Sequence, residues 1–237
     1  SIMLDGHLRF STVTSRNSDV KIAWRQRLEH EDRTLMRKRL SEWPRESPVI
    51  LESSFGWEWL CDELEQAGLE PHLASSRKAA AWRSARGLAK SNRTDADLLS
   101  ELGREKEGWW KVWLPSPEAR ARREWMRHRM SLVHMQTALK NRIHAMLHRH
   151  GILHDHADLF GAAGRRMLTR LANDPREGRL GESGRTTMKS SLQVLDHLRR
   201  QIAAVTRTTY RQLQASAEGK RLQSLPGIGG VLAYTIL

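Results

Sequence analysis

The sequence is poor in cysteine: Cys61 is the only one among 237 residues. A single cysteine forms no disulfide within the chain, which excludes a disulfide-stapled scaffold and suits a reducing compartment. The sequence also has no apolar run near the 18 residues that a transmembrane helix needs. The first ten residues, SIMLDGHLRF, lack the basic and apolar segments of a signal peptide. These absences predict a cytoplasmic protein with no membrane partner.

Acidic residues are outnumbered in this sequence. The chain has 27 Asp and Glu against 40 Lys and Arg, which gives a formal net charge of +13 and a pI of about 10.8. The excess is spread through most of the chain and not gathered in a tail. A polyanionic partner, DNA first, is therefore the leading interpretation. A solvated basic surface without a partner is the alternative.

The first part of the chain mixes strand and helix patterns. Residues 1–28 are rich in β-prone, alternating segments, and PVILESS (48–54) is a short apolar run typical of a strand buried on both faces. Apolar residues at helical spacing predict helices over 31–43 and over WEWLCDELEQAG (57–68). Because strands and helices alternate, we expect an α/β core, with two short helices within 76–104 and a last short strand at KVWLPSP.

The second part reads as helical. Residues 117–150 contain neither Gly nor Pro after Pro117 and predict one long basic helix. An apolar column at a spacing of seven gives this helix a coiled-coil-like stripe: Trp125, Leu132, Leu139 and Met146. Residues 187–217 predict a second long helix. The stripe is expected to pack on a partner helix, either within the chain or across a dimer.

A few carboxylates fall at strand ends or at the start of a helix. Asp5 lies on the first strand, Glu52 ends the run VILE, and Asp95 and Asp97 follow AKSNRT. Carboxylates brought together from separate elements can hold Mg²⁺ for phosphodiester chemistry. The alternative is structural: Asp near a helix N-terminus caps it or complements its dipole, and Glu52 can pair with an arginine. Composition and spacing leave both interpretations open.

Five segments, taken in order, resemble a known family. The segments are MLDGHLRFSTV, VILESSFGWEWLCDELEQAGLEPHLASSRK, AKSNRTDADLLSEL, ALKNRIHAMLHRHGI and LPGIGGVLAYTIL. Together they resemble the DEDD transposases of bacterial insertion sequences, the group typified by IS110 and IS1111, which includes the Piv-type DNA invertases. The resemblance implies an RNase H-like (RuvC-like) α/β fold and a site-specific recombinase that cleaves and transfers DNA strands.

The resemblance also implies a site and a domain plan. The four acidic ligands of Mg²⁺ would fall on Asp5, Glu52, Asn92 and Asp95, so that an amide replaces the third acid. The RuvC-like catalytic domain would span 1–113 and the helical region 114–217. Residues 218–237 would begin a helix-hairpin-helix-like C-terminal transposase domain that supplies a nucleophilic serine. Because the sequence stops at Leu237, we expect that domain to be truncated.

Partners follow from the same resemblance together with the charge pattern. DNA is the expected partner, along with a guide RNA (the bridge RNA) and further copies of the chain through the long helices. The expected nucleic-acid contacts are basic side chains near the helices and two glycines that let a phosphate approach. They are Lys90, Arg93, Arg122, Arg123, Arg127, Arg129, Lys140, Arg142, Gly227 and Gly229.

Two other functions fit parts of the sequence. One is a RuvC-like nuclease that cleaves DNA junctions by itself without rejoining strands. The other is a non-catalytic nucleic-acid-binding relic of a mobile element, an interpretation that Asn92 and the expected truncation favour. Cleavage of a branched duplex with Mg²⁺ and without strand rejoining would favour the nuclease. Tight binding with a steep salt dependence but no metal-dependent chemistry would favour the relic.

Overall fold

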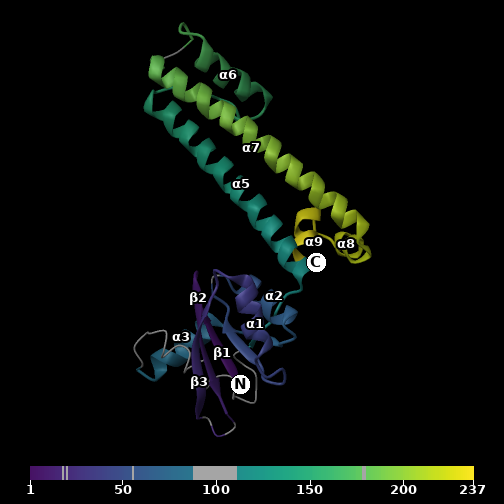
Figure 1. Ribbon diagram of the computed structural model, residues 1–237. Coiled ribbons are helices and arrows are strands. Elements are labelled where there is room, and N and C mark those ends of the chain that lie inside the picture. The colour runs from purple at the N-terminus through teal and green to yellow at the C-terminus, as the bar shows by residue number, and fades with distance from the viewer. Residues whose placement is uncertain (18, 20, 55, 88–110, 178–179) are drawn as a thin grey trace. The chain divides into compact units, whose positions relative to one another are not determined.

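The computed structural model describes residues 1–237 apart from 18, 20, 55, 88–110 and 178–179. The chain divides into two compact units, Ser1–Leu114 and Pro115–Leu237 (Figure 1). The first unit is a mixed α/β sheet unit and the second is built from helices. The α/β class predicted from the sequence is therefore confirmed for the first unit.

The first unit is organised around a six-stranded sheet in the order β3-β2-β1-β4-β5-β6. Its strands are β1 (Ile2–Gly6), β2 (Phe10–Arg16), β3 (Ile22–Glu29), β4 (Val49–Glu52), β5 (Pro71–Ala74) and β6 (Lys111–Val112). Strands β1, β4 and β5 run parallel, whereas β2 is antiparallel to β1 and β3, and β6 is antiparallel to β5. This order and these directions are consistent with an RNase H-like fold.

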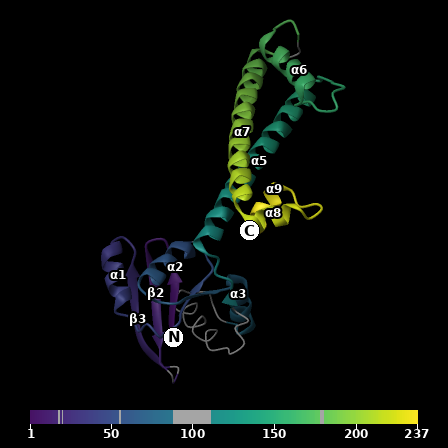
Figure 2. The same ribbon diagram turned by 90° about the vertical axis from the view of Figure 1, so that its right-hand side faces the viewer.

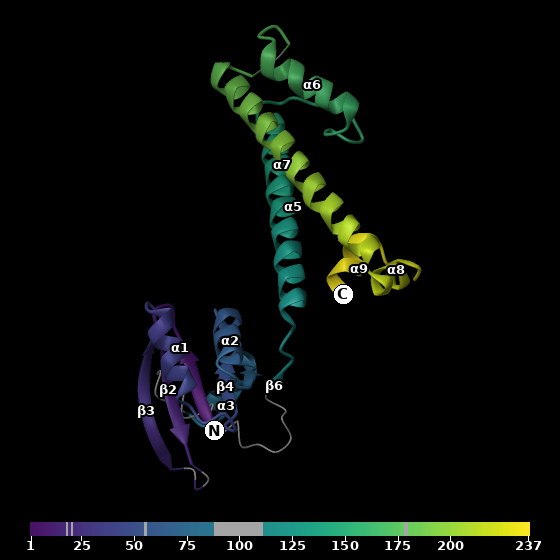
Figure 3. The same ribbon diagram turned by 45° about the vertical axis from the view of Figure 1, so that its right-hand side comes forward.

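Helices cover both faces of this sheet. Helices α1 (Arg33–Ser41) and α2 (Trp57–Gln66) pack on one face, where the main core gathers Leu4, Leu51 and Cys61 with other buried apolar residues (Figure 3). Helix α3 (Ser76–Ala85) contributes Ala79 and Trp82 to a smaller cluster with Met3 and Ile50. Alternate residues of β1 and β4 thus enter different cores, which explains why the three residues before Glu52 in β4 are all apolar.

Local sequence signals set several helix ends in this unit. Asp32 caps α1, because its carboxylate accepts a hydrogen bond from Leu35 N at 2.9 Å. Helix α2 stops where Gly68 adopts a φ of +75°, a left-handed conformation that favours glycine at the C′ position.

The second unit is dominated by two long helices, α5 (Pro117–Arg149) and α7 (Glu182–Ala215). They pack side by side and antiparallel (Figure 1). Accordingly, Nε1 of Trp125, near the start of α5, donates a hydrogen bond to Oγ1 of Thr209, near the end of α7. At the other end of the pair, Ile143 shares a cluster with Met188 and Leu192. The pairing is within the chain, while coiled-coil character remains a prediction.

The seven-residue column of α5 packs in this helical unit as its spacing predicts. Leu132 is buried, and Trp125, Leu139 and Met146 are partly buried against the neighbouring clusters. Helix α7 begins at Glu182, five residues before the predicted start at 187. The prediction missed the first turn because its residues are polar and show no apolar periodicity. An acidic residue there complements the helix dipole.

Shorter helices complete the second unit. Helix α6 (Ala162–Asn173) packs on α7 with Leu168 and Leu171. Figure 2 shows α6 at the end of the helix pair that lies away from α8 and α9. Helices α8 (Ala217–Gln223) and α9 (Gly230–Ile236) lie at the other end of α7, where α9 also contacts α5. Within the described part of the chain, no helix combines the length and the apolar character needed to cross a membrane.

Candidate active site

Asp5 is the first predicted ligand that the structure places. It lies near the end of β1, opposite Thr12 of β2, and its residue surface is 8% exposed. Its carboxylate Oδ2 lies 3.3 Å from Nε2 of His7. Because side chains alternate along a strand, Asp5 shares the sheet face of Met3, on the α3 side, and not that of Leu4.

Glu52, the last residue of β4, stands beside Asp5. The parallel register pairs Leu4 with Leu51, so the next residues along the two strands, Asp5 and Glu52, continue the same row. Neighbouring strands lie about 4.8 Å apart, and paired residues of parallel strands project to the same face. The sheet therefore brings these two predicted ligands together at the carboxyl ends of adjacent central strands.

The neighbours of this carboxylate pair are small or polar. On β5, Ala74 pairs with Glu52, and its methyl group leaves room beside the glutamate. Just after β5, Ser76 N lies 3.4 Å from Ser53 Oγ and donates a hydrogen bond to it, which ties the start of α3 to the end of β4. The Glu52 carboxylate forms no hydrogen bond or ion pair with another described residue.

The remaining predicted ligands lie outside the described residues. These are Asn92 and Asp95, and the basic residues Lys90 and Arg93 fall in the same segment. Among the residues that the structure does describe, no group of three or more His, Cys, Asp or Glu side chains is arranged to hold a metal ion. The structure thus supplies two adjacent carboxylates of the predicted four-ligand set.

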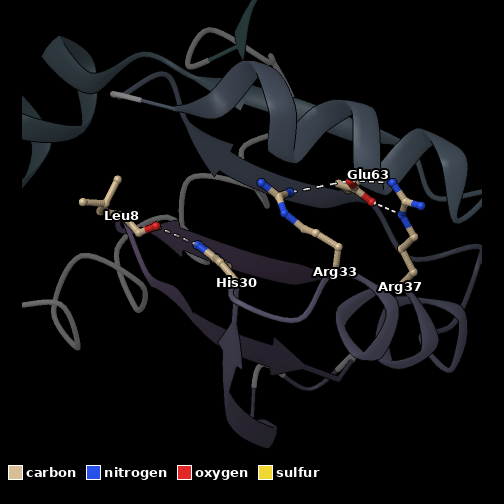
Figure 4. A network of polar contacts seen from close by, with 5 residues as sticks. All are labelled: Leu8, His30, Arg33, Arg37 and Glu63. Carbon is tan, nitrogen blue, oxygen red and sulfur yellow. Dashed lines mark hydrogen bonds and ion pairs between the residues drawn. The ribbon is translucent and has the colours of Figure 1, made fainter.

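A second polar cluster, which the sequence did not predict, lies on the α1 and α2 side of the sheet (Figure 4). Glu63 of α2, only 8% exposed, accepts hydrogen bonds from Arg37 of α1, from Nε at 2.5 Å and from Nη2 at 2.9 Å. Nη1 of Arg33 lies 3.5 Å from the same carboxylate. The hydrogen bond from Arg37 lowers the pKa of Glu63 below its ordinary value. The available signal was the spacing of Arg33 and Arg37, which places both on one helix face.

Buried His30 supports the hairpin that follows β1. Its Nε2 lies 2.8 Å from Ser11 Oγ, and its Nδ1 lies 3.4 Å from the carbonyl oxygen of Leu8. Burial lowers the pKa of His30 below its ordinary value. Ser11 has no exposed surface, which excludes it as an accessible nucleophile. This pair positions the β1–β2 turn next to Asp5.

The basic residues of α5 differ in what they contact. Arg129 Nε donates to Thr206 of α7 at 3.0 Å, and Arg122 Nη2 donates to the carbonyl oxygen of Leu237 at 2.5 Å. Nζ of Lys140 lies 5.2 Å from the ring centroid of Phe160. The remaining predicted contacts on this helix are exposed: Arg123, Arg127 and Arg142. Their part in nucleic-acid binding remains a prediction.

Gly227 and Gly229 lie in the turn between α8 and α9. Gly227 has a φ of +84°, a conformation that favours glycine, and Gly229 precedes the first residue of α9. A Cβ added at either position would meet no atom within 4 Å. The turn is therefore open at both glycines, which suits the close approach of a backbone or a phosphate.

The fold and the two acids at the strand ends fit one class of protein. A sheet of this order, with acids at the ends of its two central parallel strands, is consistent with an RNase H-like enzyme of nucleic-acid processing. A family model described as a transposase, the IS110-type DEDD transposases, matches residues 4–152. The match covers more than half of the chain, so the chain belongs to this family. No curated protein matches it.

Proposed function

We propose that this insertion-sequence transposase carries out metal-dependent DNA strand cleavage and transfer at the carboxyl ends of β1 and β4, where Asp5 and Glu52 lie. The proposal is supported by the register of β1 and β4, which pairs Leu4 with Leu51, the residues that immediately precede Asp5 and Glu52. A basic protein gains little from two adjacent acids on a phosphate-facing surface unless a cation neutralises them, because the carboxylates alone would repel the DNA backbone.

The donor set fits Mg²⁺. Mg²⁺ prefers hard oxygen ligands and takes few of them from the protein. Asp5 and Glu52 would hold it together with Asp95 and, through its amide oxygen, Asn92. When bound, the ion lowers the pKa of a bound water or hydroxyl and stabilises the departing oxygen of a phosphodiester. The chain contributes rigidity, because the register of two central strands fixes the spacing of the two carboxylates before substrate arrives.

The helical unit supplies the nucleic-acid contacts in this proposal. The exposed arginines of α5 would neutralise backbone phosphates, with little dependence on sequence. We propose that the same surfaces hold DNA and a guide RNA, and that the long helices mediate assembly of several copies. Support comes from the net charge of +13 and from the exposed arginines Arg123, Arg127 and Arg142.

A second candidate function rests on one residue. Asn92 stands where the family pattern has an acid, and a neutral amide binds Mg²⁺ less well than a carboxylate. A chain weakened at this ligand would act as a non-catalytic nucleic-acid-binding protein. The two candidates differ in a single property, which is metal-dependent cleavage.

The test is nicking of supercoiled DNA carrying the ends of the element, with Mg²⁺, with Mn²⁺ and with chelator. The proposal expects nicking that needs the metal and is abolished by Asp5→Asn and by Glu52→Gln. Glu46→Gln is the matched control, since Glu46 is an exposed acid that precedes β4 at the opposite end of the strand. The non-catalytic candidate would instead be supported if the chain binds DNA in a salt-dependent manner without nicking it, and if Asn92→Asp restores the nicking.

A further inference from the structure

The sheet face that carries Asp5 continues onto two further strands. The antiparallel register pairs Asp5 with Thr12 of β2, and Thr12 with Arg27 of β3. Directly paired residues of antiparallel strands project to the same face, so Asp5, Thr12 and Arg27 form one row across the sheet. Neighbouring strands lie about 4.8 Å apart, so the Cα atoms of Asp5 and Arg27 are separated by roughly 10 Å. A basic side chain thus shares the face of the proposed active site.

Strand β3 forms one edge of the sheet and presents its basic residues on this face (Figure 3). Trp24 and Leu28 pack against or within the α1–α2 core, so the residues that alternate with them, Arg25 and Arg27, point to the opposite face. Both arginines are exposed, and the side chain of Arg27 is 59% exposed. The cluster that α3 makes on this face gathers residues of β1, β4 and β5. The part of the face formed by β3 is therefore accessible to a ligand.

The guanidinium of Arg27 is held in place by an aromatic ring. Its Cζ lies 3.6 Å from the ring centroid of Phe10, which is a cation–π contact. The Phe10 ring in turn contacts the imidazole of His7, with centroids 4.7 Å apart. Phe10 pairs with Glu29, two residues beyond Arg27 along β3. The side chain of Arg27 therefore leans along the strand towards the turn that follows β1, which is the end of the sheet where the two carboxylates lie.

Most hydrogen-bond donors of this guanidinium are available to a ligand. Nε of Arg27 donates to Oε1 of Glu29 at 2.5 Å, whereas the two Nη groups form no hydrogen bond with another described residue. A guanidinium has five N–H donors, of which the Nη groups carry four. The Glu29 side chain is 58% exposed, and ion pairs exposed on both sides contribute little to stability. The main effect of this pair is thus to orient the guanidinium.

We propose that Arg27 binds a phosphate of the DNA strand that is cut at Asp5 and Glu52, close to the cleaved linkage. The inference rests on the function proposed above, because it takes the carboxyl ends of β1 and β4 as the place of cleavage. It adds a nucleic-acid contact in the sheet unit to those proposed for the helical unit. The planar fork of a guanidinium matches the geometry of a phosphate, and such a contact positions the strand without reading its sequence.

The test is a methylphosphonate scan, in which single neutral linkages replace the phosphates of an element-end DNA duplex one at a time. Binding to the full chain is measured by fluorescence anisotropy with Mg²⁺. The wild-type chain is expected to lose affinity at one or two consecutive linkages close to the nicked one. Arg27→Gln is expected to bind unmodified DNA roughly tenfold more weakly and to lose no further affinity at those linkages. Arg39→Gln is the matched control, an exposed arginine of α1 on the other face of the sheet, and it should behave as wild type.

Two results would overturn the inference. If Arg27→Gln binds unmodified DNA as tightly as the wild-type chain, no phosphate lies on Arg27. If the variant binds more weakly but stays sensitive at every linkage that the wild-type chain senses, the loss comes from net charge or from a displaced Phe10. In both cases, nicking that requires Asp5 and Glu52 leaves the proposed function standing. If Asp5→Asn and Glu52→Gln nick as wild type while one linkage is sensed only through Arg27, the proposed function fails and the phosphate contact stands.

Discussion

The packing of α6 gives a prediction that depends on one glycine. Gly164 lies in the first turn of α6, buried against the backbone of Leu159. A Cβ built at this position would lie 2.5 Å from the Leu159 carbonyl carbon and 2.6 Å from its Cα, with the carbonyl oxygen also in conflict. Cβ atoms essentially never approach other heavy atoms closer than 3.0 Å. Because the obstacle is backbone, no side-chain rotation relieves it, and α6 must move away from the turn at Leu159.

The magnitude follows from two opposing effects. Overpacking a well-packed site costs about 1–3 kcal/mol, and the rigid backbone obstacle places Gly164→Ala at the upper end. Replacing glycine by alanine within a helix stabilises the helix by about 1 kcal/mol. We therefore expect Gly164→Ala to destabilise α6 by about 2 kcal/mol. The assay is amide hydrogen exchange of the full chain read by mass spectrometry, which reports the opening free energy of α6 separately from that of the sheet unit.

A matched substitution lies in the neighbouring helix. Gly184 is in the first turn of α7, but a Cβ there would meet only side-chain atoms, Leu180 Cδ2 at 3.3 Å, Leu180 Cβ at 3.5 Å and His150 Nε2 at 3.8 Å. Gly184→Ala should therefore leave protection unchanged or raise it by up to about 1 kcal/mol. If Gly164→Ala leaves the protection of α6 equal to that of wild type, the close approach of α6 to Leu159 is refuted. Equal losses in both variants would refute the reasoning from local contacts.

Three further predictions follow from particular contacts. Glu63 has a lowered pKa because of Arg37, so its stabilising effect is present above the ordinary glutamate pKa and is lost as pH falls through the lowered value. Glu63→Gln should flatten this part of the acid-unfolding profile, and an unchanged profile would refute the pairing. Cys61 is fully buried, so a thiol reagent should modify it only in denaturant; rapid modification of the native chain would contradict the α2 packing. Arg127→Gln should lower the slope of log Kd against log salt for DNA binding by about 1, whereas Arg129→Gln, whose Nε is bonded to Thr206, should change it less; equal effects would show that both arginines reach phosphate.

The elements with strong periodicity could be predicted from the sequence. The first three residues of β4 are all apolar because Val49 and Leu51 face the α1–α2 core while Ile50 faces the α3 side. The seven-residue column of α5 predicted a packed stripe, and α7 provides its partner within the chain. In both cases a buried face requires apolar residues at regular spacing, so that spacing in the sequence predicts the element and its buried face.

The boundary between the first two strands could not be predicted from the sequence. The turn between β1 and β2 comprises His7, Leu8 and Arg9, and none of these is the Gly, Pro, Asn or Asp that marks most tight turns. Gly6, which looks like a turn signal, is the last residue of β1. The hairpin is held by tertiary contacts instead, since His30 reaches back to Ser11 and Leu8. Such long-range support leaves no local signature.

The site shows the same contrast. Asp5 and Glu52 were identified from the sequence by resemblance to the family, but their adjacency depends on the register between two strands that are far apart in the chain. The place of His7 beside Asp5 could have been predicted from strand alternation alone. The contact of its ring with Phe10, with centroids 4.7 Å apart, could not, because it depends on how the hairpin packs.

The central claim is that carboxylates from separate elements hold one divalent ion. Its most direct test is a Mn²⁺ titration of the full chain followed by electron paramagnetic resonance, with Asp5→Asn, Glu52→Gln and Asp95→Asn compared with the Glu46→Gln control. We expect each of the first three variants to weaken the same tight site by roughly tenfold or more, and the control to bind as wild type. Binding that is unchanged in Asp5→Asn and Glu52→Gln would contradict the account.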